Sequence, residues 1–452
     1  MVSTSRDVLL RLLGLSMVAV ALGACEGTWL GVNNDPPLVG QRISVLATEH
    51  KLKPSAELQG KIQLPKPRRN ADWPQAGGFP PHAMHHIDLG ASVSKLWLGN
   101  AGVGAVSRDR LLSSPIIGGG RAFVMDGEAT VIAFDAKTGW RQWVRELSTD
   151  EDRGASLKSG GIAFDDGRIY ATTGFGQVIA LRAEDGEEVW RRSLWAPLRA
   201  APTVSGDRVF VVTKDNELRV LSTTDGRELW THTGIQEVAS LLGSPSPAVD
   251  SGVVVVGYSS GELFALRVEN GGVLWSDSLT TVRRSDPLSN MSDIRGRPVI
   301  DRGRVYSISH SGIMVAIDLR TGQRLWELEA GGTDQPWVAG DFLFVIGNES
   351  EIIAVEAKTG QVAWISQLPK WEDEEDHEGR IQWTGPVLAG DRLIATGSHG
   401  RVYSLSPYTG EILGTEEMPD GVSMAPIVAD GMLYFLTNNG QLVAYGTVEP
   451  DR

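Results

Sequence analysis

The sequence predicts an all-β protein, an eight-bladed β-propeller of four-stranded antiparallel blades whose ring is closed by an N-terminal strand. A short motif, typified by AIDLRTGQRLW from Ala316 to Trp326, recurs along most of the 452 residues. Its eighth copy stops before the last strand, and a matching strand with Trp97 stands upstream of the first copy. A chain of this length suits two or three domains or one repeat architecture, and the recurring motif favours the repeat.

Each repeat unit reads as four strands joined by three tight turns. The third turn, Thr-Gly or a similar pair, precedes a tryptophan that lies four residues after the glycine. Glycine adopts the positive φ that such turns demand. A four-stranded unit cannot bury both faces alone, and a tryptophan buries on the order of 150–250 Å², so radially stacked blades should dock through these rings. The expected docking residues are Trp143, Trp190, Trp230, Trp275, Trp326 and Trp364.

The two ends of the repeat array depart from the pattern. The seventh copy has Gly414 where the tryptophan belongs, and the eighth ends near Ala444 without an outer strand. A strand from Ser94 to Leu98, carrying Trp97, would complete the last blade and remove the exposed sheet edges. We therefore expect Trp97 to dock beside Ala444, and we place the propeller at residues 85–447.

The N-terminal region reads as a processing and anchoring segment. Residues 1–24 predict a signal peptide, because an arginine-containing start precedes an apolar run too short to span a bilayer. Leu22-Gly23-Ala24-Cys25 resembles the lipobox of bacterial lipoproteins, which implies a lipid on Cys25; a chance cysteine after an ordinary signal peptide is the alternative. Cys25 is the only cysteine, which excludes an intrachain disulfide. The proline-containing residues 25–84 are expected to form a lipid-anchored flexible tether.

Charge and motifs weaken several functional classes. A formal net charge of −14 argues against binding to nucleic acid. The G-x-S-x-G string at 257–261 needs a strand–turn–helix context, whereas the repeat places it in a hairpin. His82, His85 and His86 could bind a metal weakly, but the sequence suggests no further ligand, so we expect no catalytic residue, metal or cofactor. The acidic run 371–380 should be a solvated, mobile loop, with a partner-steering patch as the alternative.

The repeat A-x-D-x-x-T-G-x-x-x-W resembles the docking motif of quinoprotein-type propellers, which two families share. The pyrroloquinoline-quinone dehydrogenases hold quinone and calcium at the ring centre, and many have a disulfide of adjacent cysteines that this chain lacks. The lipobox, QRISVL, ADWPQAGG and the propeller together resemble the BamB family, lipoproteins of the outer-membrane β-barrel assembly machinery (the BAM complex).

The resemblance to BamB implies a non-enzymatic scaffold without a cofactor, anchored by its lipid to the periplasmic face of the outer membrane. Its implied partners are the periplasmic POTRA domains of BamA, the other BAM subunits and unfolded outer-membrane proteins, whose insertion it would aid. A quinone-dependent periplasmic dehydrogenase is the alternative.

The resemblance also implies partner-binding residues in two loops. WAPLRAAP carries a Leu-Arg pair of the family onto Leu198 and Arg199, and LSNMSDIRGRP carries an Asp-containing stretch onto Asp293. Arg295 stands where the family often has a second Asp. Both stretches follow a tryptophan-bearing strand and precede a proline-containing strand, so we expect them on the same face of the ring. The alternative is that these are ordinary loop residues.

Overall fold

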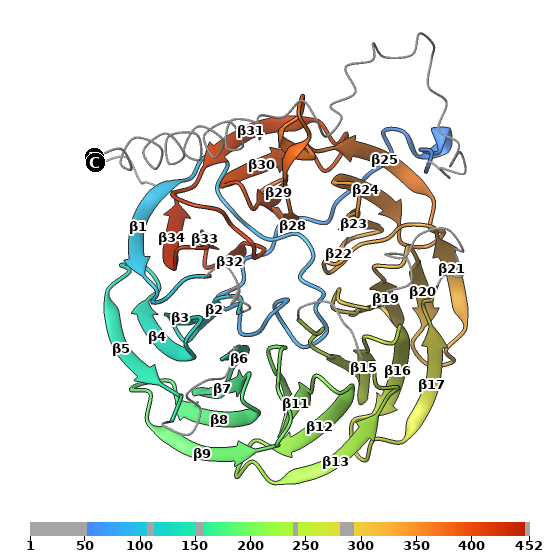
Figure 1. Ribbon diagram of the computed structural model, residues 1–452. Coiled ribbons are helices and arrows are strands. Elements are labelled where there is room, and N and C mark those ends of the chain that lie inside the picture. Colours follow the sequence, from blue (N-terminus) through green and yellow to red (C-terminus); the bar gives the residue numbers. More distant parts are fainter. Residues whose placement is uncertain (1–51, 106–112, 150–157, 238–242, 281–292, 448–452) are drawn as a thin grey trace, which may run out of the picture. The chain divides into compact units, whose positions relative to one another are not determined.

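Eight four-stranded antiparallel sheets surround a central channel in the computed structural model (Figure 1). The structure describes residues 52–105, 113–149, 158–237, 243–280 and 293–447, and they belong to one compact unit that begins at Lys51. The predicted fold class is thereby confirmed, including the closing strand contributed by the N-terminal part of the chain.

In every blade the first strand lies at the channel and the fourth at the rim. Blade 1 has β2 (Ile116–Gly118), β3 (Arg121–Met125), β4 (Thr130–Asp135) and β5 (Arg141–Glu146). Blade 2 has β6 (Ser159–Asp165), β7 (Arg168–Thr173), β8 (Gln177–Arg182) and β9 (Glu188–Ser193). Blade 3 has β10 (Thr203–Ser205), β11 (Arg208–Val212), β12 (Glu217–Ser222) and β13 (Glu228–Thr233). Blade 4 has β14 (Ala248–Asp250), β15 (Val253–Gly257), β16 (Glu262–Arg267) and β17 (Val273–Ser278).

The second half of the ring follows the same order. Blade 5 has β18 (Val299–Asp301), β19 (Arg304–Ile308), β20 (Met314–Asp318) and β21 (Arg324–Leu328). Blade 6 has β22 (Trp337–Ala339), β23 (Phe342–Ile346), β24 (Glu351–Glu356) and β25 (Val362–Gln367). Blade 7 has β28 (Trp383–Ala389), β29 (Arg392–Gly397), β30 (Arg401–Leu405) and β31 (Ile412–Glu417). Blade 8 has β32 (Ile427–Ala429), β33 (Met432–Leu436), β34 (Gln441–Gly446) and β1 (Ser94–Asn100).

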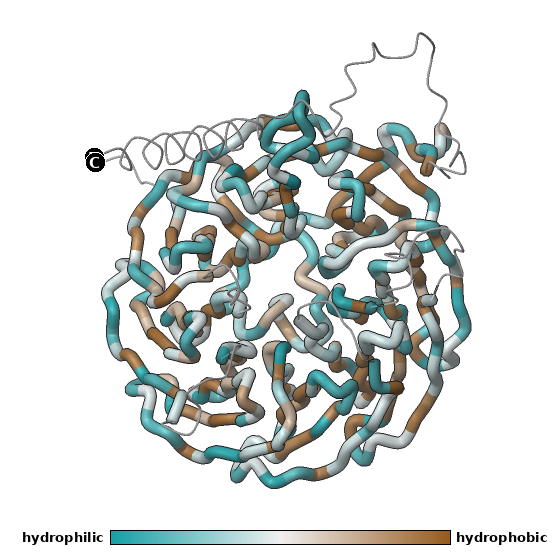
Figure 2. Tube along the Cα trace, in the orientation of Figure 1, coloured by the Kyte–Doolittle hydropathy of each residue, from teal (hydrophilic) through white to brown (hydrophobic). Residues whose placement is uncertain are grey.

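The hydrophobic core lies between the blades and is built mainly from their two middle strands. In blade 1, β3 is buried except for its first residue, whereas the rim strand β5 is mostly exposed. Phe123 of blade 1 and Ile179 of blade 2 belong to one buried cluster, as stacked sheets require. Hydrophobic residues accordingly recur along the strands of every blade in Figure 2.

The Asp and Thr of the motif close the third turn of a blade. In blade 1, one carboxylate oxygen of Asp135 accepts bonds from the backbone N–H and the hydroxyl of Thr138, both at 2.8 Å. These bonds, the hydroxyl's first, lower the pKa of Asp135. Gly139 follows with a φ of 71°. Asp318 and Thr321 repeat the arrangement in blade 5 with the same two distances.

Tryptophans lock seven of the eight blades to the next blade around the ring, blade 7 being the exception. Trp326 of blade 5 donates from Nε1 to the carbonyl of Ala357 in blade 6 at 3.0 Å. Its ring lies on Gly360, where an added Cβ would meet the ring at 2.7 Å, so the glycine is needed for space as well as for its positive φ. The other Nε1-to-carbonyl bonds join Trp97 to Ala136, Trp143 to Ala183, Trp190 to Thr223, Trp230 to Val268, Trp275 to Leu319 and Trp364 to Pro407.

The ring closes in blade 8, where β1 pairs antiparallel with β34 and Trp97 lies opposite Ala444. Because the rim strand of this blade comes from the other end of the chain, no turn joins β34 to β1. A tryptophan at Gly414 in blade 7 would therefore find no Thr-Gly turn to cover. Gly414 pairs with Ser404, and an added Cβ there would meet nothing within 4 Å. The two departures from the repeat thus have one cause.

Residues 70–87 form a channel segment that crosses the channel and bonds to all eight blades. The innermost strand of a blade presents unpaired backbone groups to the channel, and buried groups of this kind need partners. Trp73 exchanges two backbone bonds with Ile117 at 2.9 Å, and the Gln75 amide bonds both backbone groups of Val204. The remaining links run from Pro74 to Phe164, Pro80 to Val249, Pro81 to Ile300, His85 to Trp337, Ile87 to Leu388 and Asn70 to Val428.

The flexible tether expected over residues 25–84 does not describe residues 52–84. The short 3-10 helix η2 (Ala56–Leu58) buries Leu58, and the Ser55 N–H donates to Val362 of blade 6 at 2.8 Å. Prolines suggested a linker, but several offer their carbonyls to the blades, a role that needs no N–H. Composition cannot distinguish these two uses of proline. Residues 25–51 lie outside the described part, and for them the tether stays a prediction.

Candidate partner-binding face

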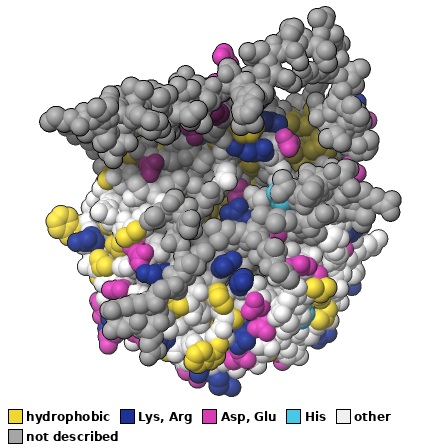
Figure 3. All heavy atoms as spheres, in the orientation of Figure 1, with side chains coloured by type: hydrophobic (Ala, Val, Ile, Leu, Met, Phe, Trp, Pro, Cys, Tyr) yellow, Lys and Arg dark blue, Asp and Glu magenta, His cyan; other side chains and the backbone are white. Residues whose placement is uncertain are grey.

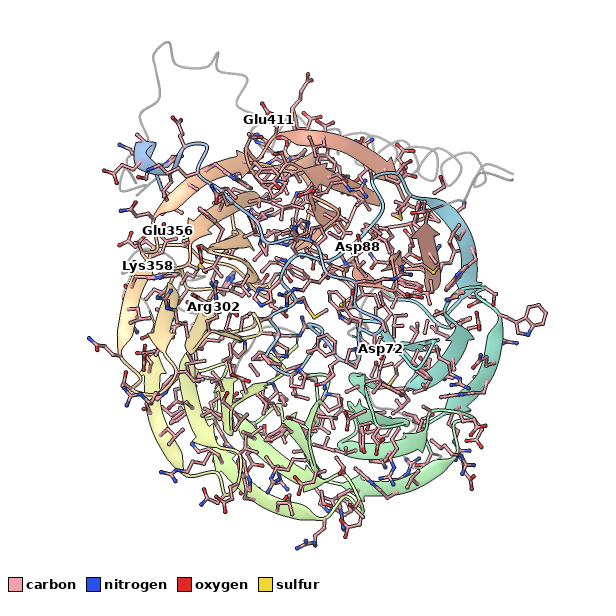
Figure 4. The ribbon with its side chains drawn as sticks, turned by 180° about the vertical axis from the view of Figure 1, so that it is seen from behind. Asp72, Asp88, Arg302, Glu356, Lys358 and Glu411 are labelled. Carbon is pink, nitrogen blue, oxygen red and sulfur yellow. The ribbon has the colours of Figure 1, made fainter. Side chains whose placement is uncertain are left out.

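The described residues of the two predicted partner stretches, 195–202 and 293–298, lie on the same face of the ring. Adjacent strands of a blade are antiparallel, so the connections into the innermost strands and the turns between second and third strands share one face, the connection face. The opposite face carries the other turns, including those of Arg302, Glu356, Lys358 and Glu411 (Figure 4). Asp72 belongs to the same face, because its carboxylate accepts from the Gly119 N–H in the turn between β2 and β3. Basic and acidic side chains are interspersed over the face seen in Figure 3.

Two backbone bonds recur in the connections and decide which side chains reach solvent. In these connections a proline leads into the innermost strand of the next blade. The residue four positions before this proline donates its backbone N–H to a carbonyl of the preceding blade, either at the end of that blade's second strand or one residue after it. Leu198 does so to Thr173 at 3.2 Å, and Ile294 to Tyr258 at 3.3 Å. The residue immediately before this donor accepts a backbone N–H of the next blade through its carbonyl. The Asp293 carbonyl accepts from the His310 N–H in this way, at 3.0 Å. The same two bonds recur in two other connections. Gly332 donates and Gly331 accepts before blade 6, and Val422 donates and Gly421 accepts before blade 8.

This frame places the four predicted residues in two classes. Leu198 is fully buried and packs with Val204 and Val209, and Asp293 is only 2% exposed. Arg199 and Arg295 each stand three residues before the leading proline, in blades 3 and 5; Arg295 is exposed and Arg199 partly so. The structure therefore brings the two arginines to equivalent positions at the surface, and it turns Leu198 and Asp293 inward. The two arginines are not equivalent when the repeats are aligned on their tryptophans, but they are equivalent when the repeats are aligned on the leading prolines.

Trp195 is the surface residue of this face that sequence reasoning missed. Its side chain is 92% exposed and its φ is 58°, a left-handed conformation that is unusual for a bulky residue. Leu194 and Ala196 on either side are buried, and their backbones are held against Gly176. The loop thus holds the indole outward. A signal existed in the sequence, since Trp195 stands five residues after Trp190 and outside the repeat register.

Ile235 adds a second exposed apolar side chain in the next connection of the ring. It is 61% exposed. Its N–H donates to the Glu262 carboxylate at 2.7 Å, and its carbonyl accepts from the Asn216 amide at 2.6 Å. Three consecutive connections, between blades 2 and 5, therefore present Trp195 and Arg199, then Ile235, then Arg295. This is the combination of aromatic, aliphatic and guanidinium groups that concentrates binding energy at protein interfaces.

The acidic run 371–380, expected to be a mobile loop, forms a hairpin of β26 (Trp371–Asp373) and β27 (Glu378–Arg380) between blades 6 and 7. The Arg380 guanidinium lies 5.7 Å from the centre of the Trp371 ring, and the His377 ring packs against the same ring at an interplanar angle of 39°. These contacts order the hairpin, which projects in teal between β25 and β31 in Figure 2. Its carboxylates are exposed, as expected of a solvated segment.

The three clustered histidines do not converge on one point: His82 and His85 contact blade 5, and His86 contacts blade 7. His82 bonds the Pro298 carbonyl through Nδ1 at 2.8 Å, and His85 approaches the Asp301 carboxylate at 3.4 Å. His86 bonds the Pro65 carbonyl and accepts from the Asp391 N–H at 3.1 Å. Within the described residues, no group of three or more His, Cys, Asp or Glu side chains is placed to hold a metal. The G-x-S-x-G string forms the turn between β15 and β16, as predicted from the repeat.

Cys25, the predicted lipid attachment site, lies outside the described residues, and so does the signal peptide. Over the part of the chain that is described, no helix has the length and apolar character needed to cross a bilayer.

Comparisons with known proteins relate most of the ring to one family. The family model described as "Outer membrane protein assembly factor BamB" matches residues 103–159, 146–366 and 370–449. The factor of that name from Yersinia pestis is 27% identical over 359 residues, covering 78% of this chain and 89% of its own. The one from Shewanella oneidensis is 26% identical over 337 residues, covering 73% and 83%.

Solved structures share the fold with this chain. The crystal structure of BamB from Moraxella catarrhalis superposes with a TM-score of 0.66 at 19% identity, covering 79% of this chain and all of that one. A quinohemoprotein alcohol dehydrogenase from Comamonas testosteroni gives 0.64 at 14% identity, covering 87% and 84%. At such identities these likenesses show the propeller architecture alone. The family match, which spans most of the ring, goes further: this chain belongs to the BamB family of outer membrane protein assembly factors.

Proposed function

We propose that the protein is a non-enzymatic scaffold of the BAM complex, tethered through a lipid on Cys25 to the periplasmic face of the outer membrane. Its connection face binds the periplasmic POTRA domains of BamA, and with the other BAM subunits it aids the insertion of unfolded outer-membrane proteins. Family membership supports the assignment to outer-membrane protein assembly. The observation that carries the binding role is Trp195, an almost fully exposed indole in a loop held by backbone bonds, four residues before Arg199.

An exposed tryptophan in a tied loop suits an interface anchor. A non-glycine residue at a positive φ costs on the order of 1–3 kcal/mol, and such strain persists where the surrounding structure holds it, often at functional sites. The bonds made by Leu194, Pro197 and Leu198 supply that hold. A preordered indole loses little conformational entropy when a partner covers it, and tryptophan and arginine are enriched among the residues that dominate binding energy.

Titration of purified variants against BamA's POTRA domains tests the binding role. We expect Trp195→Ala, Arg199→Glu and Arg295→Glu each to weaken binding by about 2–4 kcal/mol, roughly 30- to 1000-fold. Trp140→Ala is the matched control, because Trp140 is 78% exposed but lies in a turn of the opposite face. Equal affinities for Trp195→Ala, Trp140→Ala and the parent protein would remove the connection face from the interface.

The anchor is tested separately by Cys25→Ser, which removes the only sulfur available for lipid attachment. We expect this variant to leave the detergent phase in phase-separation experiments on cell extracts. Unchanged partitioning would contradict a lipid at this position.

The dehydrogenase alternative draws no support from the ring centre. Quinone dehydrogenases would need a cofactor-sized site there, and pockets for small molecules span roughly 300–1000 Å³. In this chain the channel segment crosses the centre, and the cavity beside it measures about 40 Å³. The residues present do not fit a quinone.

A further inference from the structure

The small cavity beside the channel segment is lined by both polar and apolar residues. Trp73 and Gly77 of the channel segment line it on one side. Ser114, Arg297, Asp334 and Gln335 line it from the connections that lead into blades 1, 5 and 6. All four of these residues precede an innermost strand, so the cavity lies on the connection-face side of the channel.

An unpartnered donor lines this cavity. Trp73 is 3% exposed, and its Nε1 has no hydrogen-bond partner among the described residues. Its ring is fixed by stacking on Trp337, with ring centres 6.1 Å apart. Leaving a buried donor unpaired costs on the order of 1–3 kcal/mol, so an acceptor in the cavity would be stabilised. The Gln335 amide nitrogen donates to the His82 carbonyl at 2.8 Å, while its Oε1 has no partner among the described residues.

One cation and one anion, Arg297 and Asp334, line the cavity, and a second cation, Arg295, lies near both. The positive charges of Arg295 and Arg297 both act on the Asp334 carboxylate, which accepts a bond from the Thr384 hydroxyl at 3.3 Å. Among the described residues, neither Arg297 nor Asp334 has an ion-pair partner in contact. Burial lowers the pKa of Arg297, the Asp334 charge opposes that shift, and the Arg295 charge adds to it. Two cations and one carboxylate leave a local positive charge in a chain of net charge −14.

Size narrows the ligand to a small group. A cavity of about 40 Å³ has room for roughly three waters, given about 10–15 Å³ for each. A carboxylate has three heavy atoms, it accepts bonds from an indole N–H, and its two oxygens match the fork of a guanidinium.

We propose that this cavity is a carboxylate-binding site. It takes either the C-terminal carboxylate or an acidic side chain of a polypeptide that lies on the connection face. The site is defined by Trp73 and Arg297 and does not depend on BamA being the partner of the face.

Acetate titration followed by NMR of the tryptophan indole N–H groups tests the site without any partner protein. Trp73→Phe identifies the Trp73 signal by its disappearance, and it keeps a ring to stack on Trp337. We expect acetate to move that signal downfield with saturation, and Arg297→Gln to weaken the binding by about tenfold or more, because the charged half of the contact is gone. Arg401→Gln, an exposed arginine of blade 7, is the control and should leave the titration unchanged.

Two peptide pairs distinguish the sources of the carboxylate. One pair compares a short peptide with a free C-terminus against its C-terminal amide; the other compares internal Asp against Asn with both ends blocked. Competition with acetate by the free C-terminus alone assigns the site to chain ends, and competition by the Asp peptide assigns it to side chains. Any of three results would overturn the proposal. Acetate leaves the Trp73 signal unmoved, the amide and Asn peptides compete as well as their carboxylate counterparts, or a folded Arg297→Gln protein binds acetate as the parent does.

Discussion

Replacing Trp326 by alanine measures how strongly one indole holds two blades together. The side chain is 9% exposed, so about 200 Å² of largely apolar surface is lost, worth about 5 kcal/mol at 25 cal/mol per Å². Measured tryptophan-to-alanine changes in cores cost about 3–5 kcal/mol. The Ala357 carbonyl keeps its bonds from Arg304 at 3.1 Å and Tyr306 at 3.4 Å, so it is not orphaned. We expect Trp326→Ala to lower the free energy of unfolding by about 4 kcal/mol.

Urea denaturation followed by far-ultraviolet circular dichroism is the assay. Trp326→Phe should lose about half as much, because a smaller ring remains without the Nε1 donor. Trp140→Ala changes a tryptophan that is 78% exposed, and it should stay within about 0.5 kcal/mol of the parent protein. If the free energies of unfolding of Trp326→Ala and Trp140→Ala differ by less than about 1 kcal/mol, the Trp326 indole does not stabilise the contact between the blades.

Three further predictions concern the seam and the channel. Gly414→Trp restores the motif in blade 7 but should change urea stability by less than about 0.5 kcal/mol, since no turn in blade 8 receives the ring; a gain of several kcal/mol would contradict this explanation of the seam. Gln75→Ala should cost about 2–4 kcal/mol, because it orphans two buried backbone groups of Val204, and crystallography or hydrogen exchange at Val204 should show the loss; unchanged protection there would be evidence against it. Burial lowers the pKa of His82 in the folded protein from 6.5 to about 3. As the pH falls, this histidine is protonated in the unfolded chain before it is protonated in the folded protein, so the free energy of unfolding should fall by about 2 kcal/mol between pH 7 and pH 5. His82→Asn, which tolerates the positive φ and does not titrate, should remove that part of the acid sensitivity in urea titrations at the two pH values, whereas His377→Asn in the exposed hairpin should retain it.

Much of the architecture was predictable because its determinants are local. The Thr-Gly turn, the Asp that caps it and the tryptophan four residues later lie within one stretch of chain, and they recur at each blade. The missing outer strand of the last copy and the isolated Trp97 were sufficient to predict closure of the ring, and the structure pairs β1 with β34 accordingly. The site was less predictable. Leu198 and Arg199 are neighbours in the sequence, but only their relation to Pro202 and Thr173 decides that one is buried and the other reaches the surface.

By itself, the sequence determined the number of blades, their strand order and the way the ring closes, because glycine turns, strand alternation and a docking ring act over a few residues. Only the tertiary structure decided the course of residues 52–87. Their prolines and histidines carry no periodic signal, and their partners are on the innermost strands of eight blades spread over the whole repeat array. The same holds for the orphaned Trp73 N–H and the charges of Arg297 and Asp334. They meet only because the ring brings connections of distant blades to one channel, where burial leaves their polar groups short of partners.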